Sequence, residues 1–262
     1  MGDGSRPPYP ACGTKTENHV QHLQSKKVME LPKLNPNRAV DAVLWDFDGV
    51  IARTENLHVA AWQRVIRHVE IGLPADAFKT AATEDDRDLV ARVFESAGVL
   101  LHTSQVLSWC AAKQDVLIQL LKMAPPIYPN VPDVMRAIAA QGLRQAIVTS
   151  TWRANVQATL GNSRLLDLME FVIAKEDVAR PKPSPDGYRL AVQRLGLPPA
   201  RCVALEDSPV GLSAARSAGV SVLAVAHPFS PAESRADNWA GGALVLSDLQ
   251  QLATVLAASE LA

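Results

Sequence analysis

From residue 125 onward, the chain alternates between two kinds of segment, and this alternation limits the folds open to it. Short apolar segments, expected to be strands, are each followed or preceded by an amphipathic segment long enough for a helix. The expected strands are 143–149, 170–174, 201–205, 220–226 and 243–246, and the expected helices are 132–142, 152–160, 184–196, 208–219 and 249–258. Alternation of this kind predicts a parallel α/β sheet with helices on both faces.

A further apolar strand, residues 39–45, precedes a long stretch without any strand pattern. Three amphipathic segments, 54–69, 85–99 and 103–122, predict a block of helices instead. We therefore expect a core domain formed by residues 39–53 and 125–262, and an inserted helical domain formed by residues 54–124. Residues 1–38 are rich in Pro, Lys, Asn and Gln, which predicts a flexible tail.

Three helix starts carry recognisable capping residues. Ser184-Pro185 and Ser208-Pro209 each predict a serine N-cap followed by proline in the first helical position. Thr103 or Ser104 is the expected N-cap of the third inserted helix.

The composition excludes several classes of protein. Of 262 residues, 48% are hydrophobic and 20% charged, as in globular proteins, and the formal net charge of −1 argues against nucleic-acid binding. No apolar run is long enough for a membrane span, and the N-terminus lacks the layout of a secretion signal. Three cysteines, Cys12, Cys110 and Cys202, do not form a disulfide framework. We expect a reduced, cytoplasmic protein, either a monomer or a homodimer.

Polar side chains follow the first four expected strands of the core at the point where each strand ends. They are Asp46 and Asp48, then Thr149 and Ser150, then Lys175 and Lys182, then Glu206 and Asp207. Because ligands of open parallel sheets bind beyond the carboxyl ends of the strands, we expect these groups to share one site.

Four carboxylates at one sheet edge require a positive partner. An all-oxygen set without nearby His or Cys favours Mg²⁺, and Lys182 with the Thr149 hydroxyl would complete a phosphate site. Each group also has an ordinary structural interpretation. The Asp46 and Asp48 pair is a possible turn element, Thr149 a helix cap, Lys182 a solvated side chain, and Glu206-Asp207 a favourable charge at a helix start.

Four segments in this order resemble the motifs of the haloacid dehalogenase superfamily, in the subgroup of helical-cap phosphatases and β-phosphoglucomutase-like enzymes. They are "DFDGV" (46–50), "IVTS" (147–150), "KPSPDGY" (182–188) and "EDSPVGLSAARSAG" (206–219). The resemblance covers about residues 40–250. It implies a Rossmann-like parallel-sheet core carrying an inserted, all-helical cap domain.

The resemblance also implies roles for individual residues. Asp46 would attack phosphorus and become an aspartyl phosphate, while Asp48 would protonate the leaving oxygen and then activate the next nucleophile. Thr149 and Lys182 would hold the phosphoryl group, and Ser150 would be a further contact to the substrate. Mg²⁺ would be bound by Asp46, the backbone carbonyl of Asp48 and Asp207, with Glu206 either a further ligand or a group that orients the ligands.

In the expected cap, His58, Lys113 and Arg87 are candidate substrate contacts. Alternatively, His58 is packed against the helix without a functional role, and Arg87 is an ordinary charged residue at the surface. The chain departs from the family at two places. Arg53 stands where the family often has Asp, and the segment "KTAATEDDRDLVARVF" (79–94) lacks a glycine that is frequent there.

Three functions fit these residues to different degrees. A Mg²⁺-dependent phosphatase acting on a small phosphorylated metabolite, of the sugar phosphate or phosphoglycolate type, is favoured. A β-phosphoglucomutase-like phosphomutase is the alternative, and a non-enzymatic phospho-receiver or binding protein is a remote third. No G-x-G-x-x-G, G-x-x-x-x-G-K or G-x-S-x-G motif is present, which disfavours dinucleotide enzymes, P-loop proteins and α/β-hydrolases.

Overall fold

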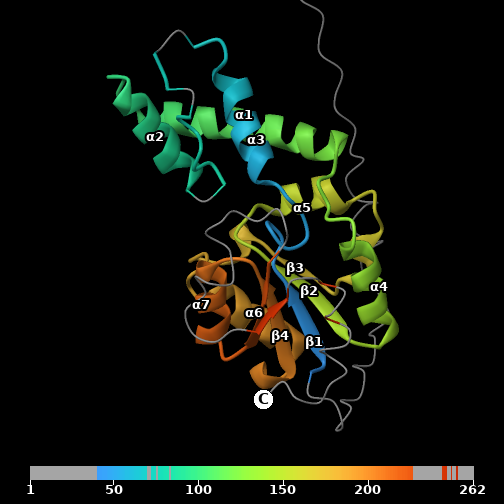
Figure 1. Cartoon of the computed structure of the whole chain (residues 1–262). Coiled ribbons are helices and arrows are strands. Elements are labelled where there is room, and N and C mark those ends of the chain that lie inside the picture. The colour runs from blue at the N-terminus through green and yellow to red at the C-terminus, as the bar shows by residue number, and fades with distance from the viewer. Residues whose placement is uncertain are drawn as a thin grey trace, which may run out of the picture. The chain divides into compact units, whose positions relative to one another are not determined.

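A computed structural model describes residues 40–69, 72–74, 76–82, 84–226, 244–246, 249 and 252. Its centre is a six-stranded, wholly parallel sheet with the strand order β3-β2-β1-β4-β5-β6 (Figure 1). The strands are β1 (Ala42–Trp45), β2 (Arg144–Val148), β3 (Val172–Ile173), β4 (Cys202–Glu206), β5 (Ser221–Val225) and β6 (Leu244–Leu246). The predicted parallel α/β sheet is confirmed.

Strand β1 lies in the middle of the sheet, between β2 and β4. In register, Trp45 lies opposite Ile147 of β2 and Leu205 of β4. From β1, strands β2 and β3 are added toward one edge of the sheet, and β4 and β5 are added toward the other edge. The direction in which successive strands are added therefore reverses beside β1. In sheets of this type the ligand crevice opens at such a reversal, beyond the carboxyl ends of the central strands.

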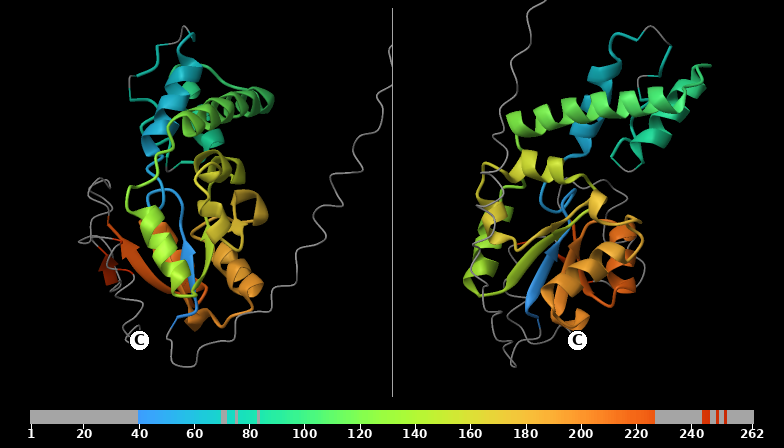
Figure 2. Two further views of the ribbon diagram at one scale, coloured as in Figure 1. Left: turned by 90° about the vertical axis from the view of Figure 1, so that its right-hand side faces the viewer. Right: turned by 180° about the vertical axis from the view of Figure 1, so that it is seen from behind.

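Helices cover both faces of the sheet (Figure 2). Alternate side chains of β1 enter two different hydrophobic clusters, Val43 and Trp45 on one face, Ala42 and Leu44 on the other. Helices α4 (Val131–Ala140) and α5 (Arg153–Leu160) contribute to the first cluster, and α6 (Asp186–Leu195) and α7 (Pro209–Ser217) to the second. Short 3₁₀ turns at Leu165–Leu168, Lys175–Asp177 and Pro199–Arg201 complete the connections. Burial of β1 on both faces explains why its sequence is apolar throughout.

The three inserted helices have a hydrophobic core of their own. They are α1 (Glu55–Ile66), α2 (Asp86–Ser96) and α3 (Thr103–Met123). Trp62 is fully buried in this cluster and stacks on Phe78, with ring centroids 5.0 Å apart. A separate core of this kind supports the domain boundaries that we propose near residues 53 and 124; the predicted tail, 1–38, lies outside the described residues.

The helix starts agree with the sequence in one case and differ in two. Ser208 is the N-cap of α7, and its Oγ accepts the Gly211 N–H at 3.1 Å, as predicted. Helix α6 begins only at Asp186, with Pro185 as N-cap, so the predicted Ser184 cap is wrong. The predicted Thr103 or Ser104 cap of α3 is also wrong. Residue His102 is the N-cap, and its N–H is donated to Gln105 Oε1 at 2.8 Å.

Two further expectations concern the whole chain. Among the described residues, no helix is both long enough and apolar enough to cross a membrane. Cys110 and Cys202 are free thiols, while Cys12 lies outside the described residues. Of the predicted terminal helix, 249–258, only Leu249 and Leu252 are described, and both are buried.

Candidate active site

Lys182 connects the carboxylates that end two neighbouring strands. Its Nζ lies 2.6 Å from Asp46 Oδ1 and 2.7 Å from Glu206 Oε1. Burial opposes the charge on this lysine, but the two carboxylates outweigh burial and raise the pKa of Lys182 above its usual value. Segments distant in sequence therefore meet in one buried, charged site, as predicted from the strand ends.

Asp46, Glu206 and Asp207 form a cluster suited to a metal ion. Each offers a carboxylate oxygen, and these oxygens lie within 4.8 Å of one another. Burial, and secondarily the charge of Asp46, raises the pKa of both Glu206 and Asp207, because three like charges oppose one another there. A cation among them would remove that cost.

One oxygen atom of Glu206 also lacks a hydrogen-bonding partner in the described part of the chain. Tyr188 donates its hydroxyl to Oε1, but Oε2 is buried without a hydrogen-bond partner among the described residues. A buried carboxylate oxygen without a donor is costly. The all-oxygen donor set and this atom together fit a hard divalent cation.

Gly49 allows the turn after β1 to pass directly beside Asp207. Its φ is +80°, in the left-handed region, and a Cβ added there would lie 1.8 Å from Asp207 Oδ2. Any side chain at residue 49 would therefore move the Asp207 carboxylate out of the cluster.

We expect Gly49→Ala to weaken metal binding, because the added methyl group displaces Asp207. Gly98→Ala is the matched control. Gly98 has a φ of +78° but nothing within 4 Å of an added Cβ, so it carries the backbone strain without the clash. Changes that reorient metal ligands typically cost about 10–100-fold in metal affinity. Calorimetric titration of both variants with a divalent cation, alongside thermal melts, measures this; equal cation affinities in the two variants would contradict it.

Asp48 lies in the same turn, two residues after Asp46. Its carboxylate accepts a hydrogen bond from the Thr54 hydroxyl. Burial raises the pKa of Asp48 to about 7, against the lowering effect of this hydrogen bond. A carboxyl group with a pKa near neutrality can both donate and accept a proton, which suits acid–base catalysis.

A cavity of about 300 Å³ opens over these groups. Residues from several strand ends line it, together with residues from the inserted helices; they include Asp46, Asp48, Thr149, Ser150, Lys182, Asp207, Glu55 and His58. Thr149 is buried, and its Oγ accepts the Thr151 N–H at 3.1 Å. Because Trp152 is the N-cap of α5, Thr149 is not that helix's cap, and this structural alternative is removed.

Glu55 is a lining residue that the sequence analysis missed. It is the first residue of α1, and burial raises its pKa. Acids are common in the first turn of helices because of the helix dipole, so the sequence alone gave no reason to single it out. Only the structure shows that Thr54, the residue before it, donates its hydroxyl to Asp48 and that Glu55 lies at the cavity.

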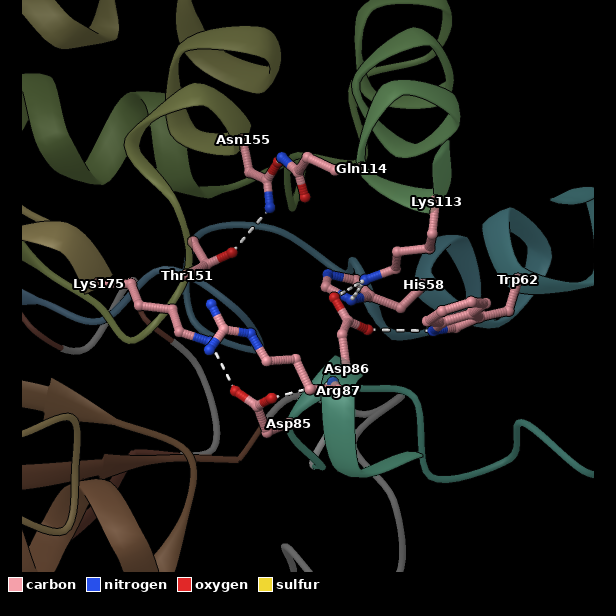
Figure 3. Close-up of polar contacts among 10 residues, drawn as sticks. All are labelled: His58, Trp62, Asp85, Asp86, Arg87, Lys113, Gln114, Thr151, Asn155 and Lys175. Carbon is pink, nitrogen blue, oxygen red and sulfur yellow. Dashed lines mark hydrogen bonds and ion pairs between the residues drawn. The ribbon is translucent and has the colours of Figure 1, made fainter. Parts of the chain in front are cut away.

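His58 and Lys113 belong to one buried network within the inserted helices (Figure 3). Lys113 is only 1% exposed, and its Nζ lies 2.8 Å from Asp86 Oδ2 and 3.0 Å from His58 Nδ1. Trp62 donates its Nε1–H to Asp86 Oδ1 at 3.0 Å. Burial and the Lys113 charge lower the pKa of His58 to about 3, so this imidazole is neutral and accepts from the ammonium. His58 lines the cavity as a packed, neutral group.

Two other predicted features lie at the surface. Arg87 is exposed and does not line the cavity, so its role as a substrate contact stays a prediction. Its backbone N–H is donated to Asp85 Oδ1 at 3.0 Å. Arg53, the departure from the family pattern, is also exposed.

The sheet order and the strand-end acids define the class of protein. The chain belongs to the haloacid dehalogenase-like hydrolases, whose family model matches residues 40–219.

Particular relatives narrow the comparison. Protein CbbY from Rhodobacter capsulatus is 31% identical over an alignment of 221 positions, which covers 81% of this chain and 95% of that protein. Fructose-1-phosphate phosphatase YqaB from Escherichia coli is 29% identical over 187 residues, or 70% of this chain and 95% of that one. The crystal structure of CbbY from Rhodobacter sphaeroides, in complex with xylulose-(1,5)-bisphosphate, superposes with a TM-score of 0.67. The two sequences are 27% identical, and the superposition covers 81% of this chain and 96% of the CbbY chain.

Proposed function

We propose that the protein is a Mg²⁺-dependent phosphatase that hydrolyses a small phosphorylated sugar through a phosphoaspartate. The observation that carries this proposal is the geometry around Asp46, whose carboxylate lies against Lys182 and beside Asp48, at the floor of a cavity. The E. coli relative is named for a sugar monophosphate, and the solved relative holds a sugar bisphosphate. These names support a phosphorylated sugar, with one phosphate or two.

Two displacements at phosphorus would complete the reaction. In the first, an Asp46 oxygen forms a bond to phosphorus, the bond to the sugar oxygen breaks, and Asp48 gives that oxygen its proton. In the second, Asp48 takes a proton from water, the water oxygen attacks phosphorus, and Asp46 leaves as a free carboxylate. Inorganic phosphate and the sugar are the products, and both aspartates return to their starting states.

Lys182 and Thr149 would bind the oxygens of the transferring group throughout. Asp46, the backbone carbonyl of Asp48, Glu206 and Asp207 are the groups that would hold Mg²⁺, which supplies positive charge opposite the phosphoryl oxygens. Ser150, at the exposed side of Thr149, is a proposed contact to the rest of the substrate.

Release of phosphate from p-nitrophenyl phosphate, followed with Mg²⁺ and after EDTA treatment, tests this function. We expect steady turnover with Mg²⁺, its loss in EDTA, and its recovery when Mg²⁺ is restored. Turnover that is unaffected by EDTA would contradict the metal site. Labelling of the protein without any release of phosphate would identify a receiver instead.

The phosphomutase alternative has a different product. With β-glucose 1-phosphate and a trace of the bisphosphate, a mutase would form glucose 6-phosphate faster than inorganic phosphate. We expect release of inorganic phosphate only.

A further inference from the structure

A second cavity, of about 120 Å³, adjoins the first. The two share the lining residues Asp48, His58, Ala82 and Ser150, so they are continuous past the reacting groups. A sugar phosphate with its phosphoryl group at Asp46 would extend its other end into this second cavity, which we call the distal cavity. The inference that follows therefore rests on the proposed function and deepens it.

Beyond Asp48, which both cavities share, the acids and lysines that line the distal cavity are all in ion pairs; Glu84 pairs with Arg92, whose Nη2 lies 2.6 Å from Glu84 Oε2. Glu84, Asp85 and Asp86 line it, and so do two lysines, Lys113 and Lys175. Both lysines already have a carboxylate partner, because Lys113 Nζ lies 2.8 Å from Asp86 and Lys175 Nζ lies 2.9 Å from Asp85. Figure 3 shows the two pairs converging from α2, α3 and the turn after β3. A phosphate that approached either lysine would therefore also approach the carboxylate that pairs with it.

Asp85 has the decisive position in this arrangement. It is the N-cap of α2, where its Oδ1 accepts the Arg87 N–H at 3.0 Å, while its Oδ2 accepts from Lys175. The helix start therefore holds the carboxylate beside Lys175. A second phosphate at Lys175 would come within a few ångströms of this negative charge, which is repulsive even though the pair is partly exposed to water.

On the side of the distal cavity formed by Gln114 and the start of α5, the lining groups are neutral and suit hydroxyl groups. Gln114 donates to Asn155 Oδ1 at 2.6 Å, and Asn155 donates to Thr151 Oγ at 2.9 Å. Trp152, which is 39% exposed, adds a flat ring with an apolar face. Amides, hydroxyls and an aromatic face are the groups that contact the hydroxyl and C–H surfaces of a carbohydrate.

We propose that the distal cavity selects sugar monophosphates with a neutral, polyhydroxylated far end and rejects bisphosphates, with Asp85 as the specificity-determining residue. The same charges disfavour a mutase, which must bind a sugar bisphosphate during its cycle.

Inhibition of p-nitrophenyl phosphate hydrolysis by a matched pair of sugars tests this selectivity without requiring that either sugar be turned over. We expect fructose 1-phosphate to inhibit at least about tenfold more strongly than fructose 1,6-bisphosphate, a difference of about 1.4 kcal/mol. A bisphosphate that binds as well as the monophosphate, or the failure of both to inhibit, would overturn the inference. The proposed function fails separately, through absence of p-nitrophenyl phosphate turnover itself.

Asp85→Asn removes one charge with little change of shape and releases Lys175. We expect this variant to narrow the ratio of the two inhibition constants several-fold, through tighter binding of the bisphosphate, and Lys175→Met in the same background to restore the original ratio. Asp88→Asn is the control, because Asp88 is an exposed acid of the same helix outside the cavity. A ratio that moves equally in Asp88→Asn would show an effect of overall charge and overturn the role of Asp85.

Discussion

Asp46→Asn will abolish steady turnover while the protein stays folded. The amide has nearly the shape of the carboxylate, but it cannot carry the phosphoryl group as an acyl phosphate, so a loss of at least about a thousandfold is expected. Lys182 keeps a partner in this variant, because Glu206 lies 2.7 Å from its Nζ. The change also removes one of three mutually repelling acids, so we expect the melting temperature to remain unchanged or to rise.

Asp41→Asn is the matched control for that experiment. Asp41 stands immediately before β1, at the end of the strand opposite to Asp46, and pairs with Arg201 at 2.6 Å. The same chemical change there should leave kcat intact and lower the free energy of unfolding, because it removes the ion pair with Arg201. Phosphate release and thermal melts of both variants measure the difference. Near-normal activity in Asp46→Asn would show that another residue is the nucleophile.

Asp48→Asn is expected to lower kcat by about 10²–10⁴-fold, the usual contribution of a positioned acid or base. The asparagine keeps a hydrogen bond with Thr54 but cannot transfer a proton in either half of the reaction. The loss should depend on the leaving group. A sugar phosphate, whose oxygen must be protonated as it departs, will suffer more than p-nitrophenyl phosphate, whose leaving group departs as an anion.

The second half of the reaction gives a separate readout for the same variant. Without a base for water, hydrolysis of the phosphoaspartate slows, so p-nitrophenyl phosphate should give a rapid burst of nitrophenol followed by a slow phase. Mass spectrometry of quenched protein should then show one added phosphoryl group. Equal losses for both substrates, with no burst and no added mass, would assign Asp48 a structural role only.

The fold could be predicted from the sequence because each strand of the core is a local apolar segment with its own flanking helix. Strand ends such as Asp46 and Glu206 then follow from topology alone, since parallel strands place all their carboxyl ends at one edge. Helix starts were less predictable. His102 and Pro185 are N-caps that intrinsic preferences do not favour, and at His102 the backbone N–H is donated to the Gln105 side chain.

Residues of the inserted helices were the least predictable part of the site. Lys113 was expected to contact substrate, but its ammonium is buried against Asp86 and His58, which no spacing rule could indicate. The pair of Asp85 and Lys175 joins residues separated by 90 positions. Contacts of this kind depend on how one domain's loops meet the other, and a single sequence carries no local pattern for them.

The position of β1 between β2 and β4 has a consequence for synthesis on the ribosome. Asp46 emerges early, but the lysine that contacts it lies 136 residues later, and the two remaining acids come after that. The nascent protein cannot cleave its substrate until the segment that contains β4 has left the exit tunnel. Premature termination anywhere before residue 207 should therefore yield catalytically silent fragments, never a partly active enzyme.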